Sequence, residues 1–178
     1  EMAELGLLKG YPDGSFKPNQ ELSQAEALSL VMRLAADAAD ITIQDDQNLA
    51  GIPEWVKKDA YKAWKKGIIN LDRFHSAQQA SRAQTAVMIA KALGLKPVDT
   101  SYMPFKDGIY ISAQDLGYIL ALYQEGIISG TPDGKFNPNS CITRAEMASI
   151  LQRILAKTQE EAQDESTLSD LEEAWEEE

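Results

Sequence analysis

Apolar residues along this chain recur mainly at intervals of three and four, the spacing that buries one face of an α-helix. One such segment contains Trp55, Val56, Ala60, Ala63 and Trp64 and stops at Gly67; another contains Leu116, Ile119, Leu120 and Tyr123 and stops at Gly126. Glycine is favoured just past a helix because the residue there takes a left-handed conformation. No segment alternates with period two for long, so the pattern predicts an all-α fold.

Three further helices are predicted to begin at Ser23, Ser81 and Thr143. Each start is followed three positions later by an acid or an amide, namely Glu26, Gln84 and Glu146. This is the spacing of a capping box, in which two side chains satisfy backbone N–H groups at the start of a helix. The apolar residues behind the third box supply its buried face; they are Met147, Ile150, Leu151 and Ile154.

The chain repeats itself. Shifted by 120 positions, residues 6–36 align without a gap on residues 126–156, with thirteen identities in 31 positions. A third, degenerate copy lies between them and carries Gly67-Ile68-Ile69 and Ser81-Arg82-Ala83-Gln84 at the matching places. Each unit is a helix, a long loop and a helix over about 60 residues. Since two short helices bury little alone, we expect one shared core with pseudo-threefold symmetry and three inter-repeat grooves, or else an open solenoid.

The long loop carries a turn motif in the outer two copies. Its residues are Pro12-Asp13-Gly14 in the first copy and Pro132-Asp133-Gly134 in the third, while the second copy lacks the motif and is three residues shorter. Proline fixes φ and glycine permits positive φ, so the motif predicts a tight turn. We expect Phe16 and Phe136, which follow the turn, to pin the loop onto the core.

These motifs resemble the S-layer homology (SLH) repeat. The third copy shows them most fully, in the run from Gly126 to Pro138 and then in Ile142-Thr143-Arg144-Ala145-Glu146. The resemblance divides the chain into repeats at 1–38 (shortened at its N-terminal end), 41–98 and 102–157, followed by an acidic tail or linker at 158–178. It implies an all-α fold in which three helix–loop–helix repeats form a three-pronged spindle around one core.

SLH modules anchor exported bacterial proteins to the cell wall, so the resemblance implies an extracellular, wall-associated protein. The partner it implies is a pyruvylated secondary cell-wall polysaccharide, linked to peptidoglycan and held in the grooves between prongs. Self-association within a surface layer is a further implied interaction. The chain departs from the family pattern at Gln24, which replaces arginine, at Gln114, where tryptophan is expected, and in the second loop. These departures put the first groove and the second loop in doubt.

Arg82 and Arg144 are predicted at the first position of their helices. A cation is unfavourable there by about 0.3–1 kcal/mol, because a helix N-terminus carries partial positive charge. The same place suits an anion, since free N–H groups and a guanidinium converge on one carboxylate, such as that of a pyruvate ketal. An inter-repeat salt bridge to Asp133 or Glu146 is the alternative. We expect Arg→Ala at either position to weaken glycan binding and barely change stability.

The other candidate ligand residues lie on loops or near a helix start. Tyr11 and Trp55 offer rings for stacking on a sugar, whereas the remaining helix aromatics are expected in the core. The loop candidates for the ligand site are Asp13, Gly14, Gly130, Asp133 and Gly134. A calcium loop starting at either aspartate would need Gly at its sixth position and Glu at its twelfth, where this chain has proline and then glutamine or arginine.

Charge is distributed unevenly along the chain. The net charge is −11, but residues 160–178 hold ten acids and no base, which leaves 18 acids and 17 bases, a net −1, in residues 1–159. A nearly neutral body lacks the basic footprint of a nucleic-acid-binding protein. No apolar run approaches the roughly 18 residues of a membrane span. With one cysteine, Cys141, and one histidine, His75, neither a disulfide framework nor a metal or cofactor site is predicted.

No catalytic residue is predicted, and the favoured function is a non-catalytic anchoring module. A glycosidase would need two carboxylates facing each other across a sugar at roughly 5–9.5 Å, whereas the acids of this chain recur in cap and turn roles. A purely structural, self-assembling module is the other alternative. The acidic tail is predicted to be a solvated linker or an exposed helix that neither folding nor wall binding requires.

Overall fold

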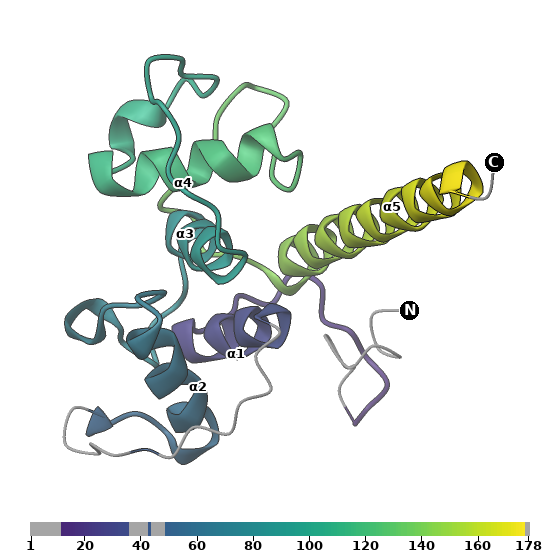
Figure 1. Cartoon of the computed structure of the whole chain (residues 1–178). Helices are drawn as coiled ribbons and strands as arrows, with labels where there is room; N and C mark the ends of the chain where they lie inside the picture. Colours follow the sequence, from purple (N-terminus) through teal and green to yellow (C-terminus); the bar gives the residue numbers. More distant parts are fainter. Residues whose placement is uncertain (1–11, 36–42, 44–48, 177–178) are drawn as a thin grey trace.

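The computed structural model describes residues 12–35, 43 and 49–176. Within these residues the chain forms five α-helices and no β-strand, which confirms the all-α prediction (Figure 1). The helices are α1 (Gln24–Leu34), α2 (Glu54–Lys65), α3 (Arg82–Ala92), α4 (Ala113–Gln124) and α5 (Arg144–Glu176). Two short 3₁₀ helices, η2 (Leu71–Arg73) and η3 (Gly108–Tyr110), lie in the connecting segments.

The predicted helix boundaries are confirmed by their hydrogen bonds. In α1 the Ser23 hydroxyl accepts from the Glu26 N–H at 3.2 Å, and the Glu26 carboxylate accepts from the Ser23 N–H at 2.8 Å. The same reciprocal pair caps α3 and α5. At the other end, α2 and α4 stop before Gly67 and Gly126, whose φ angles are +69° and +70°. Each helix of the repeat is therefore delimited by local chemistry.

The three segments that precede α1, α3 and α5 form a closed ring of backbone hydrogen bonds. The Leu22 N–H donates to the Ile142 carbonyl at 3.0 Å, the Ile142 N–H to the Ala80 carbonyl at 2.9 Å, and the Ala80 N–H to the Leu22 carbonyl at 2.8 Å. All three side chains are buried. Since the first repeat contacts the third directly, the repeats close on each other and the open solenoid is excluded.

Helices pair across the repeat boundaries. α2 packs on α1 and α4 packs on α3, so each pair joins the second helix of one repeat to the first helix of the next (Figure 1). One apolar core runs through all of them and includes the buried face of α5, made by Met147, Ile150, Leu151 and Ile154. The repeats therefore share a single core, as the sequence predicted, although the packed helix pairs do not coincide with the sequence repeats.

The loop phenylalanines differ between repeats. Phe136 is buried; its ring centroid lies 5.2 Å from that of Phe105 and 5.2 Å from the Arg82 guanidinium carbon, which confirms its expected role. Phe16 is 37% exposed, so the expectation that it pins its loop onto the core is wrong. Among the described residues its one ring contact is the Arg144 guanidinium, 5.0 Å away, which covers the ring without enclosing it.

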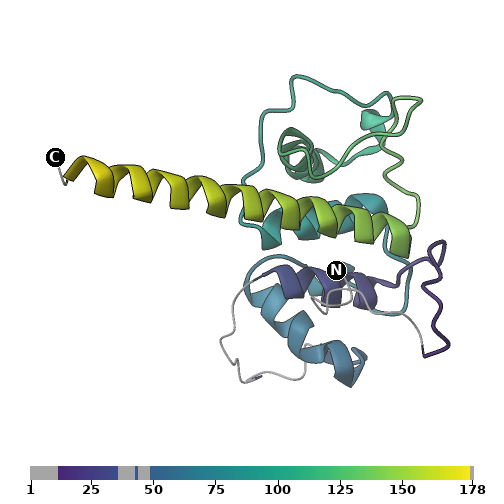
Figure 2. The same cartoon turned by 90° about the vertical axis from the view of Figure 1, so that its right-hand side faces the viewer.

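The acidic tail continues α5. The helix runs unbroken to Glu176, and Figure 2 shows its C-terminal part extending away from the other helices. Among the side chains that the structure describes, Leu155 is the last one of α5 that packs against the core. Just beyond it, the Lys157 ammonium pairs with Glu125 at the end of α4. Of the two predicted forms of the tail, a linker or an exposed helix, its backbone takes the helical one.

Gly117 of α4 lies where the connecting segment crosses the helix. A Cβ there would be 2.8 Å from the Pro97 side chain and 3.0 Å from the Val98 carbonyl oxygen, and the Val98 N–H donates to the Gly117 carbonyl at 3.1 Å. We expect Gly117→Ala to lower the free energy of unfolding, because overpacking costs about 1–3 kcal/mol and outweighs the helix-propensity gain of about 1 kcal/mol. Gln114→Ala on the same helix is the exposed control; urea denaturation measures both, and a more stable Gly117→Ala would contradict the close packing.

Truncation after Lys157 is expected to leave the melting temperature nearly unchanged, because the described core contacts of α5 end before that point and the removed segment is strongly acidic. Because the acids of the tail repel one another, any rise in melting temperature on truncation should be larger at low salt than at high salt. Truncation after Ile150 is the matched control and is expected to lower the melting temperature strongly, since it removes buried Leu151 and Ile154. A clear loss of thermal stability in the longer variant would mean that the tail packs on the body.

Candidate functional site

Two surface grooves lie between neighbouring repeats at equivalent positions. The 2–3 groove, of about 250 Å³, is lined by residues 128–132 of the third repeat and by five further side chains, Arg82, Glu146, Ser149, Ile150 and Arg153. The 1–2 groove, of about 120 Å³, has Gln24, Gln84, Met88 and Lys91 at matching helix positions. At these matching positions the 2–3 groove has two guanidinium groups where the 1–2 groove has an amide and an ammonium; Arg73 and Asp115 also line the 1–2 groove.

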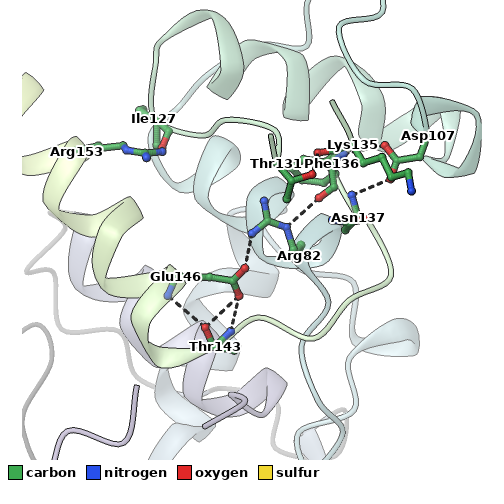
Figure 3. A network of polar contacts seen from close by, with 10 residues as sticks. All are labelled: Arg82, Asp107, Ile127, Thr131, Lys135, Phe136, Asn137, Thr143, Glu146 and Arg153. Atoms are coloured by element: carbon green, nitrogen blue, oxygen red, sulfur yellow. Dashed lines mark hydrogen bonds and ion pairs between the residues drawn. The ribbon is translucent and has the colours of Figure 1, made fainter. Parts of the chain in front are cut away.

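Arg82 joins the second repeat to the third. Its Nε donates to the Phe136 carbonyl at 2.9 Å and its Nη1 to the Glu146 carboxylate at 2.8 Å, as Figure 3 shows. The Arg82 side chain is only 14% exposed. The predicted alternative role of Arg82, an inter-repeat salt bridge to Glu146, is therefore confirmed. A charged pair that is partly removed from water contributes to stability, so Arg82→Ala is expected to lower stability, contrary to the sequence expectation.

The backbone N–H groups at the start of α3 are not available to an anion. The Arg82 N–H donates to the Ser140 carbonyl at 2.9 Å and the Ala83 N–H to the Pro138 carbonyl at 3.1 Å. The Gln84 N–H is taken by the Ser81 hydroxyl of the capping box. The expectation that free N–H groups and a guanidinium converge on one ligand carboxylate is therefore wrong for the backbone part.

The same pattern holds at the other two helix starts. The Gln24 N–H donates to the Gln78 carbonyl at 2.7 Å, and the Arg144 N–H donates to the Gln20 carbonyl at 2.9 Å. The physical reason is the closed ring, which brings the loop carbonyls of one repeat to the first turn of a helix in the next. These carbonyls satisfy the N–H groups that a helix start leaves unpaired. At these helix starts an anion can therefore be recognised by side chains but not by the first backbone N–H groups.

The first residue of α1, α3 and α5 forms a side-chain hydrogen bond to the loop of another repeat. In each case the bonded group belongs to the peptide unit that follows the loop phenylalanine. Arg144 Nε donates to the Phe16 carbonyl at 2.9 Å, as Arg82 does to Phe136. At the first repeat, the Gln24 amide oxygen instead accepts from the His75 N–H at 2.9 Å. Gln24, which stands where the family has arginine, therefore keeps the hydrogen bond between repeats but adds no charge of its own to the 1–2 groove.

Arg153 is a groove residue that the sequence reasoning missed. It lines the 2–3 groove, and its Nη1 donates to the Ile127 carbonyl at 3.2 Å. No other hydrogen bond ties it to the described part of the chain, and Arg82 Nη2 is likewise uncommitted there. The sequence contained a sign of the importance of Arg153, since Arg33 occupies the same position in the first repeat under the 120-residue shift. Together the two guanidinium groups leave several N–H donors on the groove.

The predicted residues of the third loop divide between the groove and its supporting turn. Gly130 lines the 2–3 groove, where a Cβ would come within 3.0 Å of the Lys135 carbonyl. Asp133 and Gly134 lie outside the groove lining and form the turn, with φ of +80° at Gly134. The Thr131 hydroxyl, at 2.5 Å, and then the Lys135 ammonium hold the pKa of the Asp133 carboxyl below its ordinary value. Asp133 is thus a turn former.

The remaining candidates are not brought to either groove. Asp13 closes the matching turn in the first repeat, where the Ser15 hydroxyl donates at 2.6 Å and, with the Ser15 N–H, lowers the pKa of the Asp13 carboxyl. Gly14 supplies the left-handed residue of that turn, with φ of +78°. Trp55 is 60% exposed on α2 and lines neither groove. Tyr11 lies outside the described residues.

The described ranges contain neither a metal-ligand cluster nor a helix suited to cross a membrane. No group of three or more His, Cys, Asp or Glu side chains gathers there in a way that could hold a metal ion. Among the described helices, none combines the length and apolar character that a membrane crossing requires. The third inter-repeat position, beside Arg144, falls partly on residues 1–11 and so lies partly outside the described chain.

Comparison with known proteins agrees with the repeat analysis. The family model of the S-layer homology domain matches residues 1–28 and 104–148. The chain is 29% identical over 170 residues to cell surface glycoprotein 1 of Acetivibrio thermocellus, covering 84% of this chain and 7% of that protein. It is 30% identical over 163 residues to a cellulosome-anchoring protein of the same organism, covering 85% and 36%. An endoglucanase of a Bacillus species is 29% identical over 168 residues, covering 84% and 17%.

The match to these relatives thus takes in most of this chain but spans between 7% and 36% of their lengths. It also runs through the middle repeat, which the family model leaves out. The repeated capping boxes, the Pro-Asp-Gly loops and the closed helical ring are features of the matched segments themselves. On this evidence the chain belongs to the S-layer homology domain family.

Proposed function

We propose that this chain is a non-catalytic module that holds an exported protein at the bacterial cell wall by binding a wall polysaccharide in the 2–3 groove. The observation that carries the proposal is the pair of guanidinium groups, Arg82 and Arg153, that line one groove between two repeats. The names of the relatives, a cell surface glycoprotein and a cellulosome-anchoring protein, support the location and the anchoring role. The small share of each relative that is matched is what a shared module predicts.

The groove favours a glycan that carries a carboxylate. Arg82 keeps Nη2 for a ligand while Nε and Nη1 hold the neighbouring repeat, so the ligand need not break the inter-repeat link. Arg153 adds a second cation on the same groove. Guanidinium groups bind carboxylates through charge-assisted, often bidentate hydrogen bonds. A ketal-linked pyruvate supplies such a carboxylate, and the hydroxyl groups of Ser129 and Ser149 on the groove suit sugar hydroxyls.

The groove is poorly suited to glycoside hydrolysis. That reaction uses two carboxyl groups on opposite sides of the scissile bond. Glu146 is the one carboxylate that lines the 2–3 groove, and it is committed to the Thr143 cap and to Arg82. The match to the endoglucanase covers 17% of that enzyme, which leaves most of it outside the shared segment. Binding without catalysis is therefore the function that the groove supports best.

We expect Arg153→Gln to weaken binding of a pyruvylated wall-polysaccharide fragment about tenfold or more, because a lost charge-assisted hydrogen bond costs about 1.5–3 kcal/mol. Stability should change little, since Arg153 makes one described hydrogen bond, to Ile127. Lys157→Gln removes the same charge one turn further along α5, outside the groove, and serves as the matched control.

Calorimetry with pyruvylated and unmodified fragments measures the effect. Equal affinity of the wild-type chain for the two fragments, or equal loss in the two variants, would overturn carboxylate recognition in this groove. Sedimentation with purified walls stripped of their polysaccharide tests the anchoring role separately. Undiminished binding to stripped walls would favour the structural, self-assembling alternative.

Glu146→Gln is expected to strengthen binding of the same pyruvylated fragment several-fold. The substitution removes a negative charge that competes with the ligand for Arg82, while glutamine keeps the capping box, as Gln84 does in α3. The cost in stability should be about 1 kcal/mol or less, because the pair is partly exposed to solvent. Glu26→Gln, in the capping box of α1, controls for the cap itself, and weaker binding by Glu146→Gln would contradict this role.

A further inference from the structure

The third repeat exposes an unusual amount of apolar surface in one short segment. Tyr102 is 74% exposed, Ile109 84% and Tyr110 72%, and they lie within ten residues of each other. The other large exposed apolar side chains in the described chain are scattered over separate elements. Single exposed apolar residues are ordinary, but a cluster of them next to polar groups is typical of a binding surface.

Beside Tyr110 lies a polar hollow that is separate from the grooves. The loop hollow, as we call it, has a volume of about 430 Å³ and is lined by Asp107, Tyr110, Lys135, Asn137, Pro138, Asn139 and Ser140. None of these residues lines the 2–3 or the 1–2 groove. It is an open surface depression, which suits part of a carbohydrate chain better than a fully enclosed small molecule.

The backbone around the loop hollow is held in place. The buried Asp107 carboxylate accepts from the Phe136 N–H at 2.7 Å and from the Asn137 N–H at 2.8 Å; Figure 3 shows the second of these contacts. These two hydrogen bonds stabilise the left-handed backbone conformation of Asn137, whose φ is +58°. Gly108 lies directly against the Met103 side chain, which would have to move to admit a Cβ there. Tyr110 and Asn137 thus stand on fixed backbone.

The polar side chains of the loop hollow are uncommitted. The amides of Asn137 and Asn139 and the hydroxyls of Ser140 and Tyr110 make no hydrogen bond with the described residues, so they are available to a ligand. The charged groups, in contrast, are already satisfied. Asp107 accepts the two backbone N–H groups, and the Lys135 ammonium pairs with Asp133 at 3.3 Å. The hollow therefore offers an aromatic ring and neutral hydrogen-bonding groups.

We propose that the loop hollow binds a neutral sugar of the glucose or N-acetylglucosamine type. In such sugars the ring substituents are equatorial, so each ring face presents axial C–H groups with partial positive charge. These groups suit the negative face of the Tyr110 ring. Amide and hydroxyl side chains pair with sugar hydroxyls, and no charged ligand group is required. This site differs from the 2–3 groove in place and in chemistry, and it does not depend on the function proposed for that groove.

The second repeat supplies an internal comparison. A hollow of about 350 Å³ occupies the equivalent place, lined by Ala50, Gly51, Ile52, Phe74, His75, Ser76, Ala77 and Gln78. Gly51 takes the position of Tyr110 and Ala77 that of Asn139. The second repeat therefore lacks a tyrosine at this position and has His75 and Ala77 in place of the two asparagines, so of these two hollows we expect the one in the third repeat to bind the sugar.

The test is a titration of the whole chain with cellotetraose and with the tetramer of N-acetylglucosamine, followed by amide chemical shifts. We expect saturable shifts at residues 107–110 and 137–140 with at least one of the two sugars. Tyr110→Ala should weaken that binding about tenfold, and Asn139→Ala several-fold. Both residues are exposed, so the melting temperature should not change. Tyr102→Ala removes an equally exposed ring that does not line the hollow and should bind as the wild type does.

Three results would overturn the proposal. They are no shifts at these residues with either sugar, shifts centred on the groove residues instead, and equal weakening by Tyr102→Ala and Tyr110→Ala, which would indicate unspecific contact with exposed rings. The Arg153→Gln variant separates the two sites. It should retain neutral-sugar binding in full even where it loses the pyruvylated fragment, so either site can fail without the other.

Discussion

The closed ring of backbone hydrogen bonds among Leu22, Ala80 and Ile142 fixes how the three repeats meet. Each residue of the ring directly precedes the capping residue of a helix, so closing the ring also sets the start of α1, α3 and α5. The loop of each neighbouring repeat then reaches the first helical turn and its carbonyls satisfy the N–H groups there. Buried backbone groups must be paired, which makes this arrangement self-consistent. A single core and the inter-repeat grooves both follow from it.

The same closure determines which chemistry the grooves can perform. Because the first backbone N–H groups of α1, α3 and α5 are bonded to loop carbonyls of another repeat, these helix starts offer a ligand their side chains only. Arg82 both links repeats and lines the groove. Its Nε and Nη1 hold the third repeat, while its Nη2 makes no hydrogen bond with the described residues. Arg153 serves mainly the groove. At the matching positions of the 1–2 groove, Gln24 and Lys91 replace Arg82 and Arg153, so the pseudo-symmetry of the backbone does not extend to the side chains of the grooves.

The loops add a second level of difference between repeats. In the third repeat, the Asp107 carboxylate accepts from the Phe136 N–H and the Phe105 ring packs on the Phe136 ring, which is buried. In the first, Phe16 keeps a third of its surface exposed beneath Arg144. Similar sequence motifs thus give loops of unequal burial, because a loop is fixed by what packs against it as well as by its own turn. The combination of an exposed tyrosine with two asparagine amides is found in the hollow of the third repeat and not in that of the second.

The sequence by itself determined the elements: the capping boxes at Ser23, Ser81 and Thr143, the helix ends at Gly67 and Gly126, the turns at Asp13 and Asp133, and the family. These depend on contacts within a few residues, which spacing reveals. Through the resemblance to the SLH repeat, it also predicted that Arg82 and Gly130 lie at a groove. Only the tertiary structure decided that helices pair across repeats, that Arg82 is bound to Glu146, that Trp55 lies outside the grooves, and that Arg153 lies within one. Those facts depend on which surfaces meet when the ring closes, and no local pattern records that.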